Sequence, residues 1–287
     1  MQQVTGFLKR HSLVIGIILM FALTWPIDLA YLGLLPFKAP FIVYIFLGWG
    51  FGIASLIMTG LTFGKAGVIA LLKRFLIWRV GWKWYLAAFL LISSLQFGSI
   101  LLSAAVSQTP LDFSTVYAYK IFGPSVNLAL LIVPFFLFDA IANGEEIGWR
   151  GYVLPRLQAK HSALVSSLIV GVIWGLWHLP KHLPHWDTVS FLFFMVAMLA
   201  RAVLYTWLYN NTKGSLLLTT LFHASGNTGG IVLPVVTTAA NGNIYILVIQ
   251  TLVEVTAAIL VIMLAGPERL SRTEREQAQI SPSILPI

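Results

Sequence analysis

The sequence predicts an all-α fold, a polytopic membrane helix bundle of about eight transmembrane helices. Of its 287 residues, 58% are hydrophobic and 10% are charged, and the mean hydropathy is +0.87. Soluble domains carry about 25% charged residues, so a soluble fold has no place for this much apolar surface. Apolar runs recur along the whole chain, and no polar stretch is long enough for a soluble domain.

Each predicted span is an apolar run of about the 17 to 25 residues that a membrane helix needs. The runs lie at residues 12–33, 40–62, 83–106, 125–148, 162–180, 188–209, 214–236 and 243–265. Charged residues interrupt the end of the fourth run, which is the least regular. We expect residues 1–267 to form a single integral membrane domain and the polar segment 268–287 to be a disordered cytoplasmic tail.

The distribution of Lys and Arg predicts the orientation. With both termini inside, fourteen of these cations fall in inner segments, three in outer loops and one, Arg201, within a span. Cytoplasmic loops are enriched in Lys and Arg, so we expect cytoplasmic N- and C-termini in a bacterial plasma membrane. The net charge of +8 is then a property of these loops and not of a nucleic-acid site. The absence of cysteine excludes thiol nucleophiles and cysteine metal sites.

Residues 65–83 are both basic and aromatic. This composition suits a helix that lies in the membrane interface against anionic headgroups. An ordinary cytoplasmic loop is the alternative.

Ionisable residues inside apolar spans are costly, so each is a candidate for function. Glu146 and Arg150 are four residues apart and can form an ion pair on one helix face. Glu145 is then left without that cation and is suited to hold a water molecule and take its proton. The alternative is that both glutamates pair with Arg150 or with other cations at the membrane edge.

A second cluster places Trp174 and His178 on one helix face. A polar turn near residues 158–162 lies midway between Glu145 and His178. Two antiparallel helices joined at this turn would rise equally and bring Glu145 beside His178, although Pro155 would bend the first helix. The alternative for His178 is a core histidine whose hydrogen bonds are satisfied.

A third cluster places His223 and Asn227 on one face of the seventh span. Their N–H groups could stabilise the oxyanion that forms when water attacks a peptide carbonyl. The alternative is hydrogen bonding between helices, which is common for His and Asn in membrane bundles. For Asp28, Asp139, Arg201 and Glu254 we expect ion pairs between helices.

Together and in this order, the clusters resemble the signature of the CAAX protease and bacteriocin-processing family, also called the Abi family. Its pattern is Glu-Glu-x-x-x-Arg, an aromatic-x-x-x-His and His-x-x-x-Asn, which correspond here to Glu145–Arg150, Trp174–His178 and His223–Asn227. Trp174 replaces the usual phenylalanine. The resemblance covers residues from about 120 to 235, the expected catalytic core.

The resemblance implies an intramembrane endopeptidase. Glu145, assisted by His178, would activate water, His223 and Asn227 would hold the oxyanion, and Glu146, Arg150 and Trp174 would support them. A zinc ion is an alternative, because Glu, His and His can supply three ligands. We favour no metal or other cofactor, because a zinc-bound glutamate would not serve freely as a base.

The partners implied are the lipid bilayer and a hydrophobic or lipidated peptide substrate that enters from it, with CAAX-type processing as the family's activity. The main alternative function is a non-catalytic bacteriocin self-immunity or scaffold protein. A transporter is a second alternative, but broken inverted repeats are not evident in the sequence.

Overall fold

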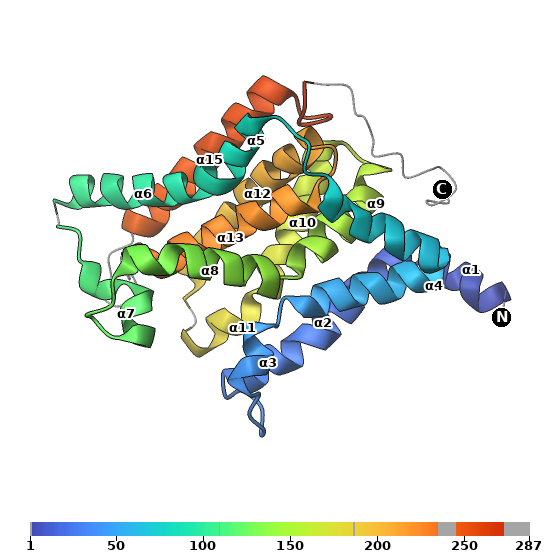
Figure 1. The fold of residues 1–287 in the computed structure, drawn as a ribbon, viewed down its shortest axis with the longest axis horizontal. Coiled ribbons are helices and arrows are strands. Elements are labelled where there is room, and N and C mark those ends of the chain that lie inside the picture. The colour runs from blue at the N-terminus through green and yellow to red at the C-terminus, as the bar shows by residue number, and fades with distance from the viewer. Residues whose placement is uncertain (1, 109, 186, 235–244, 273–287) are drawn as a thin grey trace.

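Helices make up nearly all of the structure, a computed structural model that describes residues 2–108, 110–185, 187–234 and 245–272 (Figure 1). The α-helices are α1 (Gln2–Arg10), α2 (Ser12–Tyr31), α3 (Phe41–Ile45), α4 (Trp49–Lys73), α5 (Trp82–Leu86), α6 (Ile92–Ser107), α7 (Tyr117–Phe122), α8 (Leu128–Ala142), α9 (Leu154–Gln158), α10 (Ala163–Trp177), α11 (Leu179–His182), α12 (Thr188–Asn211), α13 (Leu216–Val232) and α15 (Tyr245–Ala265). Short 3-10 helices are η1 (Arg74–Leu76), η3 (Phe113–Thr115) and η5 (Leu183–His185), and π-helices are η2 (Ala87–Leu91) and η4 (Ile147–Val153). These ranges contain no strand, so the predicted all-α class is confirmed.

Five helices in the described residues are long and apolar enough to cross a membrane. They are Ser12–Tyr31, Trp49–Leu76, Trp82–Ser107, Thr188–Asn211 and Ile246–Ala265. A sixth span is present if the pair Leu128–Ala142 and Ile147–Gln158, bent by 44° at the break between them, is counted as one. The chain is therefore an integral membrane protein with a helical bundle.

The other two predicted spans are also helical but do not meet the same test. α10 has 15 residues and α13 has 17, which is short for crossing a hydrocarbon core about 30 Å thick. α13 also carries buried polar side chains, including Thr219, His223 and Ser225. Such residues are tolerated where they face other helices rather than lipid, so a count based on apolar runs alone misses this kind of helix.

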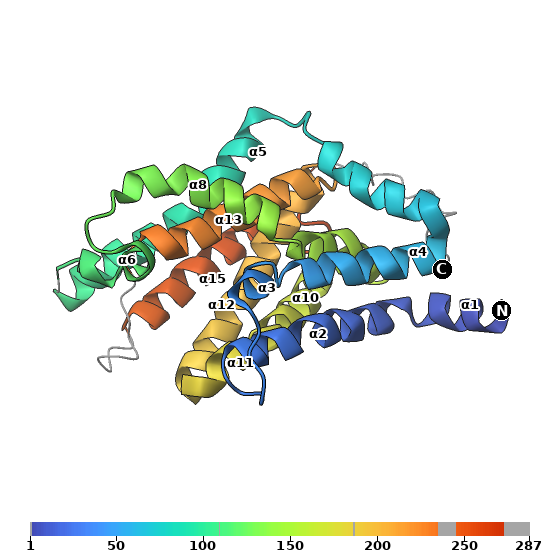
Figure 2. The same cartoon turned by 60° about the horizontal axis from the view of Figure 1, so that its bottom comes forward.

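α13 is largely enclosed by other helices, whereas α10 keeps an outer face with four exposed apolar side chains, those of Val165, Leu168, Val172 and Leu176. α13 packs against α8, α6 and α12, and α10 packs against α12, which in turn packs against α15 (Figures 1 and 2). Serine hydroxyls start both: Ser162 Oγ accepts from the Val165 N–H and Ser215 Oγ from the Leu218 N–H, each at 3.2 Å. These caps satisfy backbone donors at the helix ends and fix the starts of the helices that carry two of the three clusters.

The first residues of the predicted tail are held against two helix ends. Ala163 and Leu164 donate their backbone N–H groups to the carbonyls of Glu268 and Pro267, at 2.8 and 3.0 Å. Leu270 is fully buried, and its carbonyl accepts from the Asn211 side chain. Residues 268–272 are thus bound to the ends of α10 and α12, because their backbone supplies partners to those helix ends. The rest of the predicted tail, residues 273–287, lies outside the described residues.

Candidate active site

A break between α8 and η4 positions the two adjacent glutamates. Asn143 has an extended backbone and accepts the Glu145 N–H on Oδ1 at 2.9 Å. A Cβ atom on Gly144 would lie 2.8 Å from the Trp49 Cα atom, a backbone contact that cannot shift cheaply. Glycine is therefore required where the chain turns against α4. The turn brings Glu145 and Glu146 into the bundle, where they are 8% and 0% exposed.

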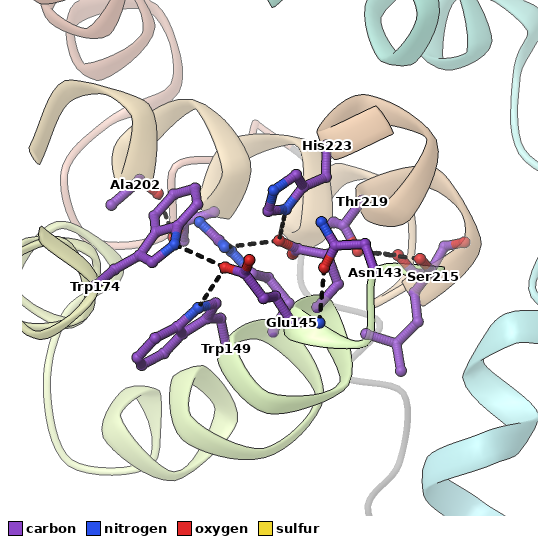
Figure 3. A network of polar contacts seen from close by, with 12 residues as sticks. Asn143, Glu145, Trp149, Trp174, Ala202, Ser215, Thr219 and His223 are labelled. Carbon is purple, nitrogen blue, oxygen red and sulfur yellow. Dashed lines mark hydrogen bonds and ion pairs between the residues drawn. The ribbon is translucent and has the colours of Figure 1, made fainter. Parts of the chain in front are cut away.

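Two indole N–H groups hold one carboxylate oxygen of Glu145. Trp174 Nε1 donates to Oε2 at 2.9 Å and Trp149 Nε1 donates to the same oxygen at 3.3 Å (Figure 3). The other oxygen, Oε1, has no hydrogen-bond partner among the described residues. Oε2 of the carboxylate is therefore fixed by two donors, and Oε1 is available to accept a hydrogen bond or a proton.

Glu146 lies at the centre of a buried charged cluster. Its Oε1 atom is 3.0 Å from Nη1 of Arg150 and 2.8 Å from Nδ1 of His223. The Arg150 guanidinium lies over the rings of Trp174 and Tyr205, 4.5 and 4.1 Å from their centroids. The predicted Glu146–Arg150 pair is confirmed, and Glu145 is free of it. The structure therefore separates the two carboxylates into one ion-paired group and one that is held by neutral donors.

His178 does not make the predicted contact with Glu145 and lies one helix turn beyond Trp174, which does. Its Nδ1 atom is 2.9 Å from the Trp174 carbonyl oxygen, and since a carbonyl only accepts, Nδ1 carries the proton and Nε2 is left as the acceptor. No hydrogen bond joins His178 to Glu145 in the described residues, because the Trp174 side chain reaches Glu145 instead. The turn that joins the two helices is present, but η4 is π-helical and fits more residues into each turn. This brings Glu145 level with Trp174.

Asn227 and His223 point to different acidic partners. His223 bonds Glu146, as described, whereas Asn227 Nδ2 donates to Asp139 Oδ1 at 3.0 Å. The second oxygen of Asp139 is buried without a partner among the described residues. Asp139 was expected in an ion pair and not at the site, because it precedes the break that separates α8 from the glutamates. The observation that links Asp139 to the site is its position on α8, because this helix packs against α13, which carries Asn227.

Of the four charged residues expected in ion pairs between helices, Arg201 and Glu254 form one. Arg201 and Glu254 form a bidentate bond, with N to O distances of 2.8 and 2.7 Å, that joins α12 to α15. The expectation is wrong for Asp139, which binds an amide. It is also wrong for Asp28, which is fully buried with neither oxygen hydrogen-bonded within the described chain.

The proposed zinc ligands do not converge. Within the described residues, no three or more His, Asp or Glu side chains form a group that could hold a metal ion. Glu145 Oε2 faces two indole donors, and Nδ1 of His223 is bound to Glu146. Each of these bonds uses one atom of the side chain, and the preference for a metal-free site over a zinc site stays a prediction.

The arrangement can place a water molecule and a carbonyl group side by side in a shielded setting. Glu145 Oε1 can accept a proton, and Asn227 retains a second N–H beyond the one given to Asp139. Glu145, Glu146 and His223 are buried, whereas Asn227 is exposed. Buried ionisable groups in a membrane protein are costly and often functional. The fold and the site together define a helical integral membrane protein with a candidate hydrolytic centre.

Comparison with known proteins agrees with this class. Residues 125–229 match the family described as type II CAAX prenyl endopeptidase Rce1-like. The chain is also similar to a protein named CAAX prenyl protease 2 from Methanococcus maripaludis, at 30% identity over 149 residues, which cover 47% of this chain. The match spans 51%, about half, of that relative's length. The matched region contains all three motifs, so the chain is similar to this family over residues 125–229.

Proposed function

We propose that this protein is an intramembrane endopeptidase that hydrolyses peptide bonds of membrane-associated or lipidated peptides, with Glu145 as the base that activates water. One observation carries the proposal: Glu145 is held through a single oxygen by Trp149 and Trp174 while its other oxygen has no partner in the described chain. A general base must be fixed in place and must keep a free lone pair for the proton that it removes.

In the proposed reaction, Glu145 Oε1 takes a proton from water as the water oxygen bonds to the scissile carbonyl carbon. The carbonyl oxygen becomes negatively charged. When the tetrahedral intermediate collapses, the C–N bond breaks and the proton held by Glu145 passes to the departing amine nitrogen. The products are a carboxylic acid and an amine, and Glu145 returns to its ionised form.

The oxyanion would be stabilised by donors from α13. Asn227 has one N–H bonded to Asp139 and a second N–H available. His223 is bound through Nδ1 to Glu146, and in the imidazolium form its Nε2–H is a further donor. Donors that are fixed before the reaction cost no reorganisation when charge develops, and this type of stabilisation is often the largest contribution to catalysis.

We assign His178 an indirect role. Its Nδ1–H group is bonded to the Trp174 carbonyl, which leaves Nε2 as an acceptor on the same helix face as the Trp174 indole. The Nε2 atom can hold the attacking water by accepting its second proton in a hydrogen bond. No metal is needed for this scheme.

The proposed substrate is a hydrophobic or lipidated peptide, with CAAX-type processing as the activity suggested by the relative's name. Support comes from an apolar cavity of about 340 Å³ that lies between η2, α6, α8 and α13. Its lining includes Phe89, Phe136, Ser225 and Thr228, and the last two flank Asn227 on α13. An apolar segment of a substrate could bind in this cavity, beside the helix that carries His223 and Asn227.

A cleavage assay tests the proposal. Cleavage of a fluorogenic lipopeptide is measured for the purified wild type and for Glu145→Ala, His178→Ala and His223→Ala. The matched control is Glu268→Ala, which removes an exposed carboxylate. We expect cleavage by the wild type and the control, with large losses in the other three. Equal cleavage by all five would exclude the proposed chemistry. No cleavage by any of them would favour a binding or scaffold function.

The same assay addresses metal dependence. Activity that survives extensive treatment with a chelator, in protein that contains no metal by elemental analysis, would support the metal-free scheme. Loss of activity that is restored by zinc would contradict it.

A further inference from the structure

The segment from residue 65 to residue 83 is strongly basic. It contains Lys65, Lys73, Arg74, Arg79 and Lys83, and the sequence has no Asp or Glu between residues 29 and 111. Its positive charge is therefore not compensated by nearby acidic residues of the same stretch. We refer to residues 65–83 as the basic elbow.

The basic elbow lies where the chain turns between two membrane spans. It covers the end of the candidate span Trp49–Leu76 and the start of the next, Trp82–Ser107. Gly64 breaks α4 with φ 64° and ψ −165°, values that glycine adopts readily. After this break, the second part of α4 runs back at an angle to the first part (Figures 1 and 2). A short connection between two spans must lie at the membrane surface.

The elbow has one face toward the protein and one face outward. Gly67, Leu71 and Arg74 are buried, and their spacing of three to four residues defines one helix stripe. The outward side carries large apolar side chains between exposed cations. These apolar residues are Ile69 (42% exposed), Leu72 (42%), Leu76 (71%), Trp78 (55%) and Trp82 (76%).

The cations are arranged close to the aromatic rings. The Arg79 guanidinium lies 5.0 Å from the centre of the Trp78 ring, and the Lys83 ammonium lies 5.1 Å from that of Trp84. Exposed apolar and aromatic groups that alternate with Lys and Arg are typical of segments that insert shallowly into a headgroup layer. The segment is helical as far as Leu76 and then turns toward α5. The helix of the first predicted alternative is therefore present in part, and its place in the membrane interface stays a prediction.

Hydrogen bonds connect the elbow to the helices of the candidate site. Arg74 Nη1 donates to the Tyr209 hydroxyl at 2.6 Å and to the Gly151 carbonyl of η4 at 3.3 Å. Ser215, which caps α13, donates through Oγ to the Ile77 carbonyl at 2.7 Å. The elbow is therefore bound both to η4, which follows the two glutamates, and to the first residue before α13, which carries His223.

We propose that the outer face of the basic elbow binds the headgroups of anionic phospholipids, and that this contact stabilises the arrangement of η4 and α13. Each Lys or Arg close to an anionic membrane surface contributes about fivefold to binding. The exposed apolar side chains between the cations distinguish a lipid layer from a soluble anion, since a soluble anion gains nothing from them. The elbow is on the side that the charge distribution assigns to the cytoplasm.

Thermal unfolding in an uncharged detergent measures the binding directly. Three ligands are titrated: short-chain phosphatidylglycerol, short-chain phosphatidylcholine and glycerol phosphate. The proteins compared are the wild type, two elbow variants (Arg79→Gln/Lys83→Gln and Lys65→Gln/Lys73→Gln) and the control Lys38→Gln/Lys120→Gln. The control removes two exposed cations outside the elbow, of which Lys120 lies in α7. We expect phosphatidylglycerol alone to raise the melting temperature of the wild type and control, and its apparent affinity to fall about fivefold per elbow cation removed.

Three results would overturn the proposal: unchanged affinity in both elbow variants, an equal loss in the control, or equal stabilisation by glycerol phosphate. Activity gives a second readout. In vesicles of phosphatidylcholine with added phosphatidylglycerol, the wild type should cleave the lipopeptide faster than in phosphatidylcholine alone, and the elbow variants should lose that difference. A wild type that is inactive in all vesicles but stabilised by phosphatidylglycerol would contradict the proposed function and leave lipid binding supported.

Discussion

The indole nitrogen of Trp174 lies 2.9 Å from Oε2 of Glu145, so a residue four positions before His178 contacts the carboxylate directly. The carbonyl of the same tryptophan accepts a hydrogen bond from Nδ1 of His178 at 2.9 Å. Trp174 thus links the proposed base to the imidazole through its side chain and its backbone. The phenylalanine that is usual at this position in the family pattern has no N–H group and could supply only the backbone contact.

This relationship predicts the effect of Trp174→Phe. The ring is kept and the donor to Glu145 is lost, so we expect kcat to fall about tenfold, since hydrogen bonds to charged groups contribute about 1.5–3 kcal/mol. Trp149 still holds the same oxygen, and the double variant with Trp149→Phe should lose more. Trp25→Phe is the control, because its indole donates to the Trp177 carbonyl and not to Glu145. An equal loss in the control would show that packing alone is responsible.

Asp139 is predicted to act through Asn227. Asp139→Asn keeps the shape but removes the charge that orients the Asn227 amide, so we expect kcat to fall about tenfold with little change in KM. Asn227→Ala should lower kcat by about 10²–10³. A double-mutant cycle decides the matter: in the Asn227→Ala protein, adding Asp139→Asn should have almost no further effect. Effects that simply add would mean that Asp139 is structural.

Arg150 is predicted to be essential for stability. It is fully buried between two aromatic rings and is bonded to the equally buried Glu146. Arg150→Gln removes one of the two cationic partners of the buried Glu146 carboxylate and leaves only His223 beside it, and breaking a buried ion pair costs about 3–5 kcal/mol. The measurement is the free energy of unfolding in detergent. Arg201→Gln is the comparison, because the Arg201 side chain is 22% exposed, and it should destabilise the protein less.

Asp187 predicts a pH dependence at the start of α12. Hydrogen bonds from Ser190 hold the pKa of this exposed carboxyl below its usual value, with further bonds from the Val189 and Ser190 backbone. A lowered pKa in the folded state means that the stabilisation is complete above the ordinary pKa and is lost as the pH falls through the lower value. Asp187→Ala should therefore lower the melting temperature at neutral pH, and the difference should disappear in strong acid.

The sequence predicts the helical membrane class and the Glu146–Arg150 pair correctly because both depend on local rules. Hydropathy depends on composition along the chain, and the ion pair depends on a four-residue spacing. The bend that precedes η4 changes neither the hydropathy nor the spacing of Glu146 and Arg150.

Contacts between distant residues were less predictable. Equal helix rise predicts Glu145 beside His178, but the π-helical η4 changes the register and brings Trp174 there. The partner of Asn227 could not be found from spacing, since Asp139 lies 88 residues away on another helix. α10 and α13 are also shorter than the apolar runs predicted for them, and α13 carries buried polar side chains that face other helices.

The role of Glu145 as the general base is tested most directly by the rate at which the Glu145→Gln variant hydrolyses a lipopeptide. This substitution preserves size and can still accept the two indole N–H bonds, but it removes the lone pair that takes a proton from water. With its melting temperature unchanged, the variant should lose about 10²–10⁴ in kcat, the usual contribution of a general base. A folded Glu145→Gln protein that cleaves the lipopeptide as fast as the wild type would contradict the role of Glu145 as the base.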